Sequence, residues 1–167
     1  MGATMYVLAS ILVLALFTFL FGDAIEKQRN PNSNPVSQDL GDGSKSITLQ
    51  RNRAGHYVFN GMVNGHPAEF LVDTGATAVS ISQSFANRLK LPRGQAMQAV
   101  TANGLTVAYA TRIDRLVAGD IEELNVTASI VPNLPGNQIL LGMSFLKRLD
   151  FSQRGDTLIL SQRRRSN

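Results

Sequence analysis

The sequence predicts an all-β domain that follows a single membrane-spanning helix. The stretch from Gly2 to Gly22 contains no charged residue, and Met5–Phe21 is almost entirely apolar. Beyond residue 46, short runs of β-branched and aromatic residues alternate with Gly, Asn and Pro at intervals of roughly ten residues, which is typical of an all-β domain. Two Asn-Gly pairs separate such runs, and this dipeptide favours a tight hairpin because both residues tolerate positive φ.

Residues 1–22 are expected to form a membrane anchor. About twenty apolar residues, each rising about 1.5 Å, cover the roughly 30 Å hydrocarbon core of a bilayer. The alternatives are a buried core helix and a cleaved signal peptide, with Gly22 and Ala24 framing the cleavage site. We favour an uncleaved anchor with residues 5–21 in the membrane, because the run exceeds the ~7–15 residues of a signal core and no Lys or Arg precedes it.

Two parts follow the anchor. Residues 23–45 are rich in Asn, Pro, Ser, Gly and Asp and predict a flexible linker. Residues 46–167 suffice for one domain with one hydrophobic core. Lys27 and Arg29 directly follow the helix, so the positive-inside rule weakly favours a cytoplasmic location for the residues after the helix. Charge alone leaves the membrane orientation open.

The composition excludes several kinds of chemistry. The chain has no cysteine, which excludes thiolate catalysis, Cys-ligated zinc and disulfide bonds. Its net charge is +4, but much of the excess lies in Arg163–Arg165, and the other basic residues are scattered without interleaved aromatic residues. We therefore expect no nucleic-acid partner. The two histidines, His56 and His66, lie beside hairpin elements, and we expect no metal site.

The strands follow from the apolar runs and the turns between them. Their predicted ranges are Ile47–Gln50, His56–Val63, Ala68–Val72, Ala99–Ala102, Leu105–Ala110, Thr111–Val117, Leu124–Val131 and Thr157–Ser161. Hairpin turns are expected at Asn64-Gly65 and Asn103-Gly104. Two short helices are expected at Gln83–Leu89 and at Ser144–Leu149, the second with Ser144 as its cap.

The segment from Phe70 to Thr77 carries the candidate chemistry. An apolar strand runs directly into Asp73, which Thr74 and Gly75 follow. A carboxylate at the end of a buried strand is costly to desolvate unless it is hydrogen-bonded or has a function. Glycine allows another backbone or a ligand to approach closely. Taken alone, this tripeptide also fits an Asx-type turn that ends a strand.

A second segment favours the catalytic interpretation. Ile139–Gly142 is an apolar run that ends in glycine, and a short helix follows at once. In this order, the two segments resemble the retropepsin-like aspartic proteases. The resemblance extends over most of Ser46–Ser161 and is closest to the bacterial, membrane-anchored, single-lobe members of that group. It implies a closed-barrel all-β fold with a flap hairpin and one or two short helices.

The resemblance also implies a role for each matching residue. Asp73 would be the catalytic aspartate, and Thr74 and Gly75 would form the active-site loop and its dimer contact. The other implied residues are Ala76 and Thr77 on the floor of the substrate site, Ala102, Asn103 and Gly104 in the flap, and Leu140, Leu141 and Gly142 beneath the loop. No metal or organic cofactor is implied. The expected location is the bacterial inner membrane, crossed once, with the catalytic domain in the periplasm.

The chemistry requires two carboxylates, whereas the chain contains one Asp-Thr-Gly. We therefore expect a homodimer in which Asp73 of two copies meets at a two-fold axis, with a peptide or protein as substrate. One alternative keeps the fold as a catalytically silent dimerisation or peptide-binding module. The other is a membrane-anchored scaffold in which Asp73 only caps a loop.

Overall fold

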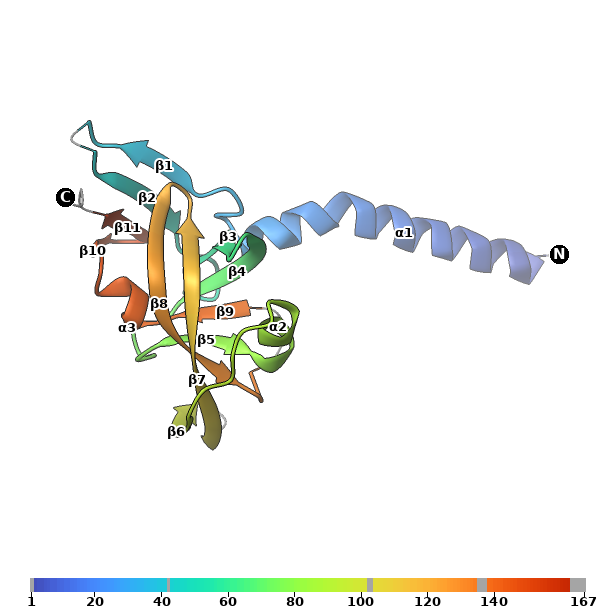
Figure 1. Cartoon of the computed structure of the whole chain (residues 1–167). Coiled ribbons are helices and arrows are strands. Elements are labelled where there is room, and N and C mark those ends of the chain that lie inside the picture. Colours follow the sequence, from blue (N-terminus) through green and yellow to red (C-terminus); the bar gives the residue numbers. More distant parts are fainter. Residues whose placement is uncertain (1, 42, 102–103, 135–137, 163–167) are drawn as a thin grey trace.

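The computed structural model describes residues 2–41, 43–101, 104–134 and 138–162, and it is dominated by strands (Figure 1). The helices are α1 (Gly2–Arg29), α2 (Gln83–Arg88) and α3 (Met143–Leu146). The strands are β1 (Val36–Asp39), β2 (Lys45–Gln50), β3 (Val58–Val63), β4 (His66–Val72), β5 (Val79–Ser82), β6 (Ala96–Thr101), β7 (Gly104–Ala118), β8 (Ile121–Val131), β9 (Gln138–Leu141), β10 (Asp150–Arg154) and β11 (Thr157–Gln162).

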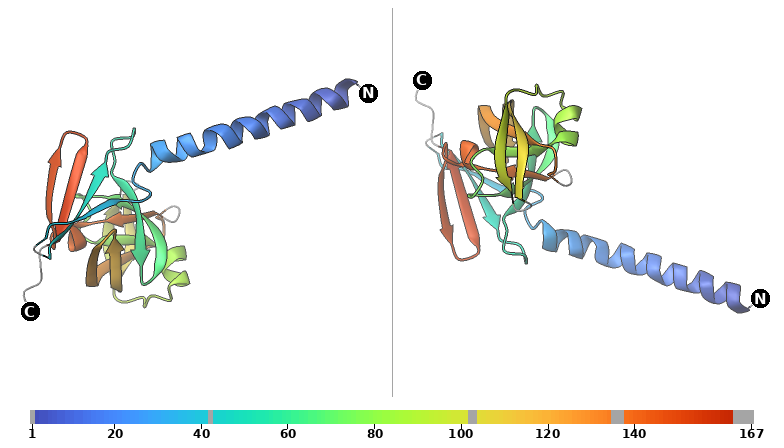
Figure 2. Two further views of the ribbon diagram at one scale, coloured as in Figure 1. Left: turned by 90° about the horizontal axis from the view of Figure 1, so that it is seen from above. Right: turned by 90° about the horizontal axis from the view of Figure 1, so that it is seen from below.

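Helix α1 projects away from the β domain (Figure 2). It is longer than predicted, because it continues through the charged residues after Gly22 and ends at Arg29. Lys27 and Arg29 in its last turn complement the negative end of the helix dipole. By length and composition Thr4–Arg29 is long and apolar enough to cross a membrane, and none of its apolar window is buried against the domain. A membrane span or a signal sequence fits this exposure, and a core helix does not.

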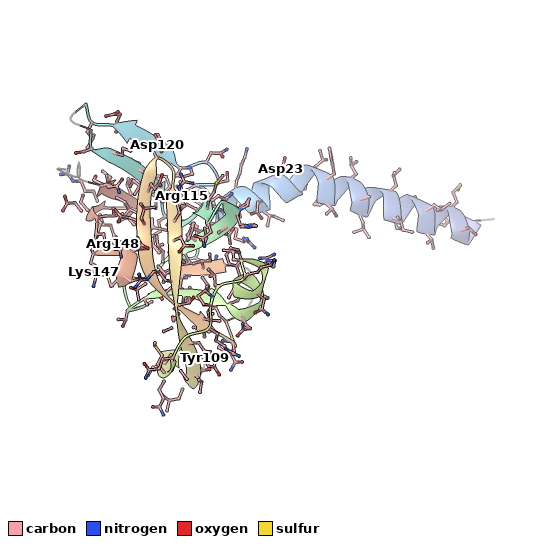
Figure 3. All side chains as sticks on the ribbon, in the orientation of Figure 1. Asp23, Tyr109, Arg115, Asp120, Lys147 and Arg148 are labelled. Carbon is pink, nitrogen blue, oxygen red and sulfur yellow. The ribbon has the colours of Figure 1, made fainter. Side chains whose placement is uncertain are left out.

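A closed barrel forms the centre of the domain, as predicted. Seven strands pair in the order β3-β4-β9-β5-β8-β7-β6, and a further pairing of β3 with β7 closes six of them into a ring. Most of the buried side chains are aliphatic or aromatic, and Phe59 and Phe70 stack with ring centroids 5.3 Å apart. Long strands β7 and β8 run along the domain, with Asp120 at their turn and Tyr109 toward the opposite end (Figure 3).

A second, four-stranded sheet has the order β1-β2-β11-β10. Strands β1 and β10 were not predicted from the sequence, and neither was β5 in the barrel. Strand β1 lies within the segment that we predicted to be a flexible linker. Its Ser37 accepts a hydrogen bond from the N–H of Asp120 in the β7–β8 turn. The part of the linker around β1 therefore packs on the domain, and we propose that the domain begins near Asn30.

The chain between α1 and β1 is held by two buried asparagines. The side chain of Asn32 is 5% exposed and donates to the carbonyls of Gln50 and Val58 at 2.9 and 2.8 Å. It also accepts from the N–H of Gln50 at 2.7 Å. The side chain of Asn30 accepts from the N–H of Asn32 and donates to Asn60. These bonds join the end of α1 to strands β2 and β3, which a flexible linker would not do.

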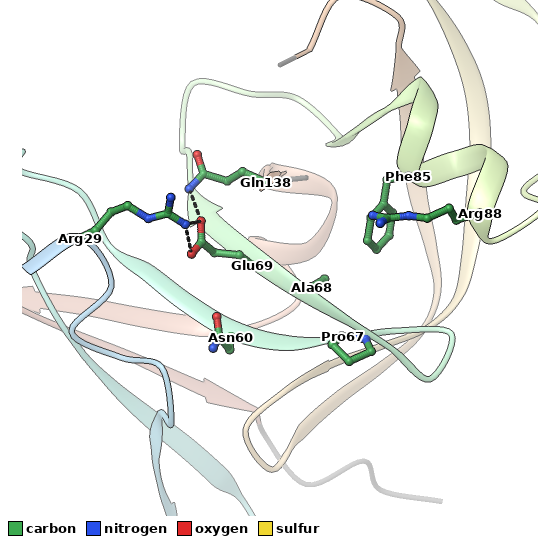
Figure 4. Close-up of a pocket in the computed structure, with 8 residues that line it drawn as sticks. All are labelled: Arg29, Asn60, Pro67, Ala68, Glu69, Phe85, Arg88 and Gln138. Atoms are coloured by element: carbon green, nitrogen blue, oxygen red, sulfur yellow. Dashed lines mark hydrogen bonds and ion pairs between the residues drawn. The ribbon is translucent and has the colours of Figure 1, made fainter. Parts of the chain in front are cut away.

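The end of α1 also contacts strand β4. Arg29 donates two hydrogen bonds to the carboxylate of Glu69, at 2.9 and 2.8 Å, and Gln138 of β9 donates to the same carboxylate at 2.9 Å (Figure 4). Because β4 leads from Glu69 directly to Asp73, the junction with the helix and the candidate site lie on one strand.

We predict that Asn32→Ala destabilises the full chain by about 3 kcal/mol, because it leaves buried backbone groups of Gln50 and Val58 without partners. The melting temperature in detergent should fall by roughly 5–10 °C. Asn34→Ala is the matched control, because Asn34 is exposed and lies two residues further along the same segment. Equal melting temperatures for the two variants would contradict the role of Asn32.

Candidate active site

The loop that contains Asp73 begins where two parallel strands end together. Strand β4 pairs with β9 so that Val72 lies opposite Leu141. The N–H of Asp73 then donates to the carbonyl of Leu141 at 3.2 Å. Asp73 therefore follows the strand directly, as predicted, but this strand is only partly buried: Phe70 is buried, while Leu71 and Val72 are half-buried. The side chain of Asp73 is itself half-buried.

Within the loop, Asp73 organises its own turn. Its carboxylate oxygen Oδ1 accepts from the N–H of Gly75 at 2.9 Å, and its carbonyl accepts from the N–H of Ala76 at 3.3 Å. This is the Asx-type turn that the tripeptide alone allowed. Among the described residues the second oxygen, Oδ2, has no hydrogen-bond partner. The turn thus fixes the carboxylate and leaves one oxygen available to an incoming group.

The loop rests on the start of helix α3. The N–H of Met143 donates to the carbonyl of Ala76 at 2.8 Å, and the N–H of Ser144 donates to that of Thr77 at 3.0 Å. These are N–H groups of the first helical turn, which lack partners inside the helix. A Cβ on Gly142 would lie 2.3 Å from the carbonyl oxygen of Ala78. Glycine at 142 therefore permits the close contact between helix and loop.

Of the predicted supporting residues, Leu140 and Leu141 lie opposite the last two residues of β4, and Gly142 contacts the backbone of the loop. Leu140 is half-buried, while Leu141 and Gly142 are buried. On the loop itself, Thr74, Gly75 and Thr77 are exposed and Ala76 is half-buried. The residues predicted to form the floor of the site, Ala76 and Thr77, are therefore accessible to solvent in the single chain.

Ser144 has a different role from the predicted one. Helix α3 begins at Met143 and its N-cap residue is Gly142, so the prediction that Ser144 caps this helix is wrong. The hydroxyl of Ser144 instead accepts from the N–H of Val79 at 2.9 Å and donates to the carbonyl of Thr127 at 2.7 Å. Ser144 thus joins β5 to β8 behind the loop, a role that depends on contacts far away in the sequence.

The predicted flap corresponds to the hairpin of β6 and β7. Gly104 begins β7 opposite Thr101, while the predicted flap residues Ala102 and Asn103 lie outside the described residues. Two apolar side chains near this end of the hairpin are strongly exposed: Val100 is 83% exposed and Leu105 is 76% exposed. Exposed apolar side chains on a hairpin suit contact with a ligand or with another chain.

Two of the hollows on the surface of the described residues differ in their relation to the Asp73 loop. The larger, about 580 Å³, is lined by Arg29, Glu69 and Arg88 and contains none of the predicted site residues (Figure 4). The smaller, about 220 Å³, includes Tyr57 and Thr74 in its lining and therefore borders the Asp73 loop. Within the described part of the chain, no three His, Asp or Glu side chains gather into a group that could hold a metal ion.

A family comparison agrees with this geometry. Residues 59–148, which include β4, the Asp73 loop, the hairpin, β9 and α3, match the family described as "gag-polyprotein putative aspartyl protease". The chain belongs to this aspartyl protease family. Its fold is similar to that of a retropepsin-like aspartic protease from Rickettsia conorii, with a TM-score of 0.60 and 30% sequence identity. That similarity covers 77% of this chain and 96% of the Rickettsia conorii chain.

Two relatives extend the comparison to other bacteria. An uncharacterized protein of Sinorhizobium sp. is 31% identical over 123 residues, which is 71% of this chain and 53% of the relative. An uncharacterized protein of Rickettsia prowazekii (strain Madrid E) is 33% identical over 124 residues, which is 69% of this chain and 51% of the relative. The chain thus spans about half the length of the curated relatives that it matches.

The stability of the Asp73 loop should depend on Gly142. We predict that Gly142→Ala costs about 2 kcal/mol or more, because its Cβ meets backbone oxygens that cannot move without displacing the loop. Thermal unfolding of the full chain measures this cost. Gly22→Ala is the control, because nothing lies within 4 Å of a Cβ at Gly22. A Gly142→Ala chain as stable as the control would contradict the close contact.

Proposed function

We propose that this chain is an aspartic endopeptidase that hydrolyses peptide bonds with two copies of Asp73, one from each protomer of a homodimer. The observation that carries the proposal is the setting of Asp73: it directly follows the partly buried strand β4, one carboxylate oxygen is fixed by Gly75, and the other is open. Two partly or fully buried acids of the domain have other partners, since Glu69 binds Arg29 and Glu123 binds Arg148. Membership of the aspartyl protease family supports the same chemistry.

The proposed reaction uses the two carboxylates differently. One is ionised and takes a proton from a water molecule, whose oxygen attacks the carbonyl carbon of the substrate. The other is protonated and donates to the carbonyl oxygen as the tetrahedral intermediate forms. Proton transfer to the amine nitrogen then breaks the C–N bond. Two carboxylates about 3 Å apart cannot easily both ionise, so the pair holds a single proton and acts as a unit.

The proposed substrate is an extended segment of a peptide or protein. It would lie between the floor residues Ala76 and Thr77 and the hairpin that carries Ala102, Asn103 and Gly104. Exposed apolar side chains on β6 and β7 would pack over the substrate and exclude water from the reacting atoms. The hydroxyl of Thr74, exposed in the single chain, would bond across the two-fold axis and fix the two loops against each other.

We further propose that residues 5–21 of α1 cross the bacterial inner membrane once, with the domain in the periplasm. The exposed apolar surface of α1 supports a membrane location. The bonds from Arg29, Asn30 and Asn32 to the domain would then hold the proposed site close to the membrane surface. Substrates near the bilayer would be favoured over substrates in solution.

We predict that Asp73→Asn reduces turnover of a mixed peptide library by more than about 100-fold, since no other group takes the proton from water. The substitution preserves size and should leave the fold intact. Asp120→Asn is the control, because Asp120 is an exposed acid at the β7–β8 turn (Figure 3). If purified Asp73→Asn cleaved peptides as fast as Asp120→Asn, the assignment of Asp73 as the catalytic residue would be wrong.

A further inference from the structure

Helix α2 and the turn after it form a basic edge of the domain. Asp and Glu number 12 in the whole chain, but none of them occurs among residues 74–113. The basic residues of that segment are Arg88, Lys90, Arg93 and Arg112. Arg88 ends α2, and Lys90 follows it by two residues; both are exposed. We call Arg88 and Lys90 the α2 edge, and it carries a local surplus of positive charge.

The α2 edge lies on the side of the domain from which α1 projects. In the views of Figures 1 and 2, α2 lies at the margin toward which α1 extends, whereas α3 lies on the opposite side. The hydrogen bonds of Arg29 and Asn32 to the domain hold α1 in this arrangement. If α1 crosses a bilayer, the α2 edge therefore faces the lipid surface.

The end of α1 has the length that a headgroup layer requires. Residues 23–29, which follow the apolar run, rise about 10 Å in a helix, and the headgroup layer on each side of a bilayer is roughly 5–8 Å thick. Arg29 therefore comes to the outer boundary of that layer. Asp23 and Glu26 balance the charges of Lys27 and Arg29, so the surplus positive charge on this side comes from the α2 edge.

A hollow of about 580 Å³ lies between the end of α1 and the α2 edge. Arg29 and Arg88 face it from opposite sides, and Glu69 is its one acidic lining residue (Figure 4). Glu69 accepts two hydrogen bonds from a single nitrogen of Arg29, Nη2, so Nε and Nη1 keep their donors among the described residues. Two guanidinium groups against one carboxylate make the lining net positive. Guanidinium groups bind phosphate oxygens well because their donors match the phosphate geometry.

Lys90 has a backbone conformation that lysine rarely adopts. Its φ is 52°, in the left-handed region, directly after the C-cap residue Leu89 of α2. Glycine is usual at this position, because a Cβ is unfavourable there. The side chain of Lys90 makes no hydrogen bond or ion pair with any described residue. No contact within the described domain offsets this strain, which favours a role toward a partner.

We propose that the α2 edge binds the headgroups of anionic phospholipids, and that the hollow between Arg29 and Arg88 receives one headgroup phosphate. This contact would hold the domain against the bilayer in one orientation. Basic residues beside a membrane are attracted to anionic lipid within about a Debye length, roughly 10 Å at 0.1 M salt. The proposal rests on the membrane location proposed for α1 and not on peptidase activity.

Quenching of a fluorescent label by lipid measures the contact. The chain has no cysteine, so Asn87→Cys, at an exposed position of α2, provides a single labelling site. The full chain is placed in vesicles with nitroxide-bearing headgroups, made either of phosphatidylcholine alone or with added anionic phosphatidylglycerol. We expect quenching at residue 87 to be about threefold stronger with the anionic lipid.

The control label is placed at Lys147→Cys. Lys147 is exposed and lies on the side of the domain away from α1 (Figure 3). Quenching there should be weak and equal in the two lipids.

Removal of single charges identifies the residues in contact. Arg88→Gln and Lys90→Gly should each lower the equilibrium constant for the contact about fivefold, as measured by the fraction of anionic lipid needed for half-maximal quenching at residue 87. Lys90→Gly should melt at the wild-type temperature or above, because glycine tolerates a positive φ. A merely structural role of Lys90 would instead lower the melting temperature. Lys147→Gln removes one exposed charge elsewhere and should change neither quantity.

The proposal is wrong if quenching at residue 87 is equal in the two lipids, or if Arg88→Gln and Lys90→Gly act no more strongly than Lys147→Gln. Alkaline carbonate washing tests the membrane span separately, because it removes a chain whose helix does not cross the bilayer. Quenching that depends on anionic lipid in a chain that washes off would support the basic surface and oppose the span. An inserted chain without such quenching would do the reverse. With Asp73→Asn in all proteins, neither measurement depends on turnover.

Discussion

The contact between helix α3 and the Asp73 loop is the interaction on which the candidate site depends. Two N–H groups at the start of α3 donate to the carbonyls of Ala76 and Thr77, and Gly142 allows the backbones to approach this closely. Pairing of β4 with β9 places both segments at the same end of the barrel. Without this contact Asp73 would end an ordinary strand on an unsupported turn.

Strand β4 connects this site to helix α1. The middle of β4 carries Glu69, which binds Arg29 at the end of α1 and Gln138 of β9. The C-terminal end of β4 leads into Asp73. The same pair of strands therefore bears the junction and the site, so the position of the site relative to α1 follows from the fold.

The parts of the structure that local sequence determines were predicted well. Asn64-Gly65 forms the turn between β3 and β4, with φ of 49° and 80°, and the apolar run before Asp73 forms a strand that is partly buried. Helix α2 begins at Gln83, as we predicted from the sequence. These features depend on turn chemistry and on the periodicity of apolar residues over short distances.

The elements that we did not predict from the sequence depend on contacts with residues far away along the chain. Strand β10 has only exposed residues and lacks alternating apolar positions, so its pairing with β11 defines it. Asn32 stands in a polar segment that resembles a linker, and its role depends on Gln50 and Val58, which only the fold brings near.

Subunit mixing tests most directly the claim that Asp73 of two copies forms one active site. When wild-type and Asp73→Asn chains exchange at fixed total protein, a shared site predicts that activity falls as the square of the wild-type fraction, to about a quarter at equal amounts. A linear fall, to about half, would contradict a site built from two copies of Asp73.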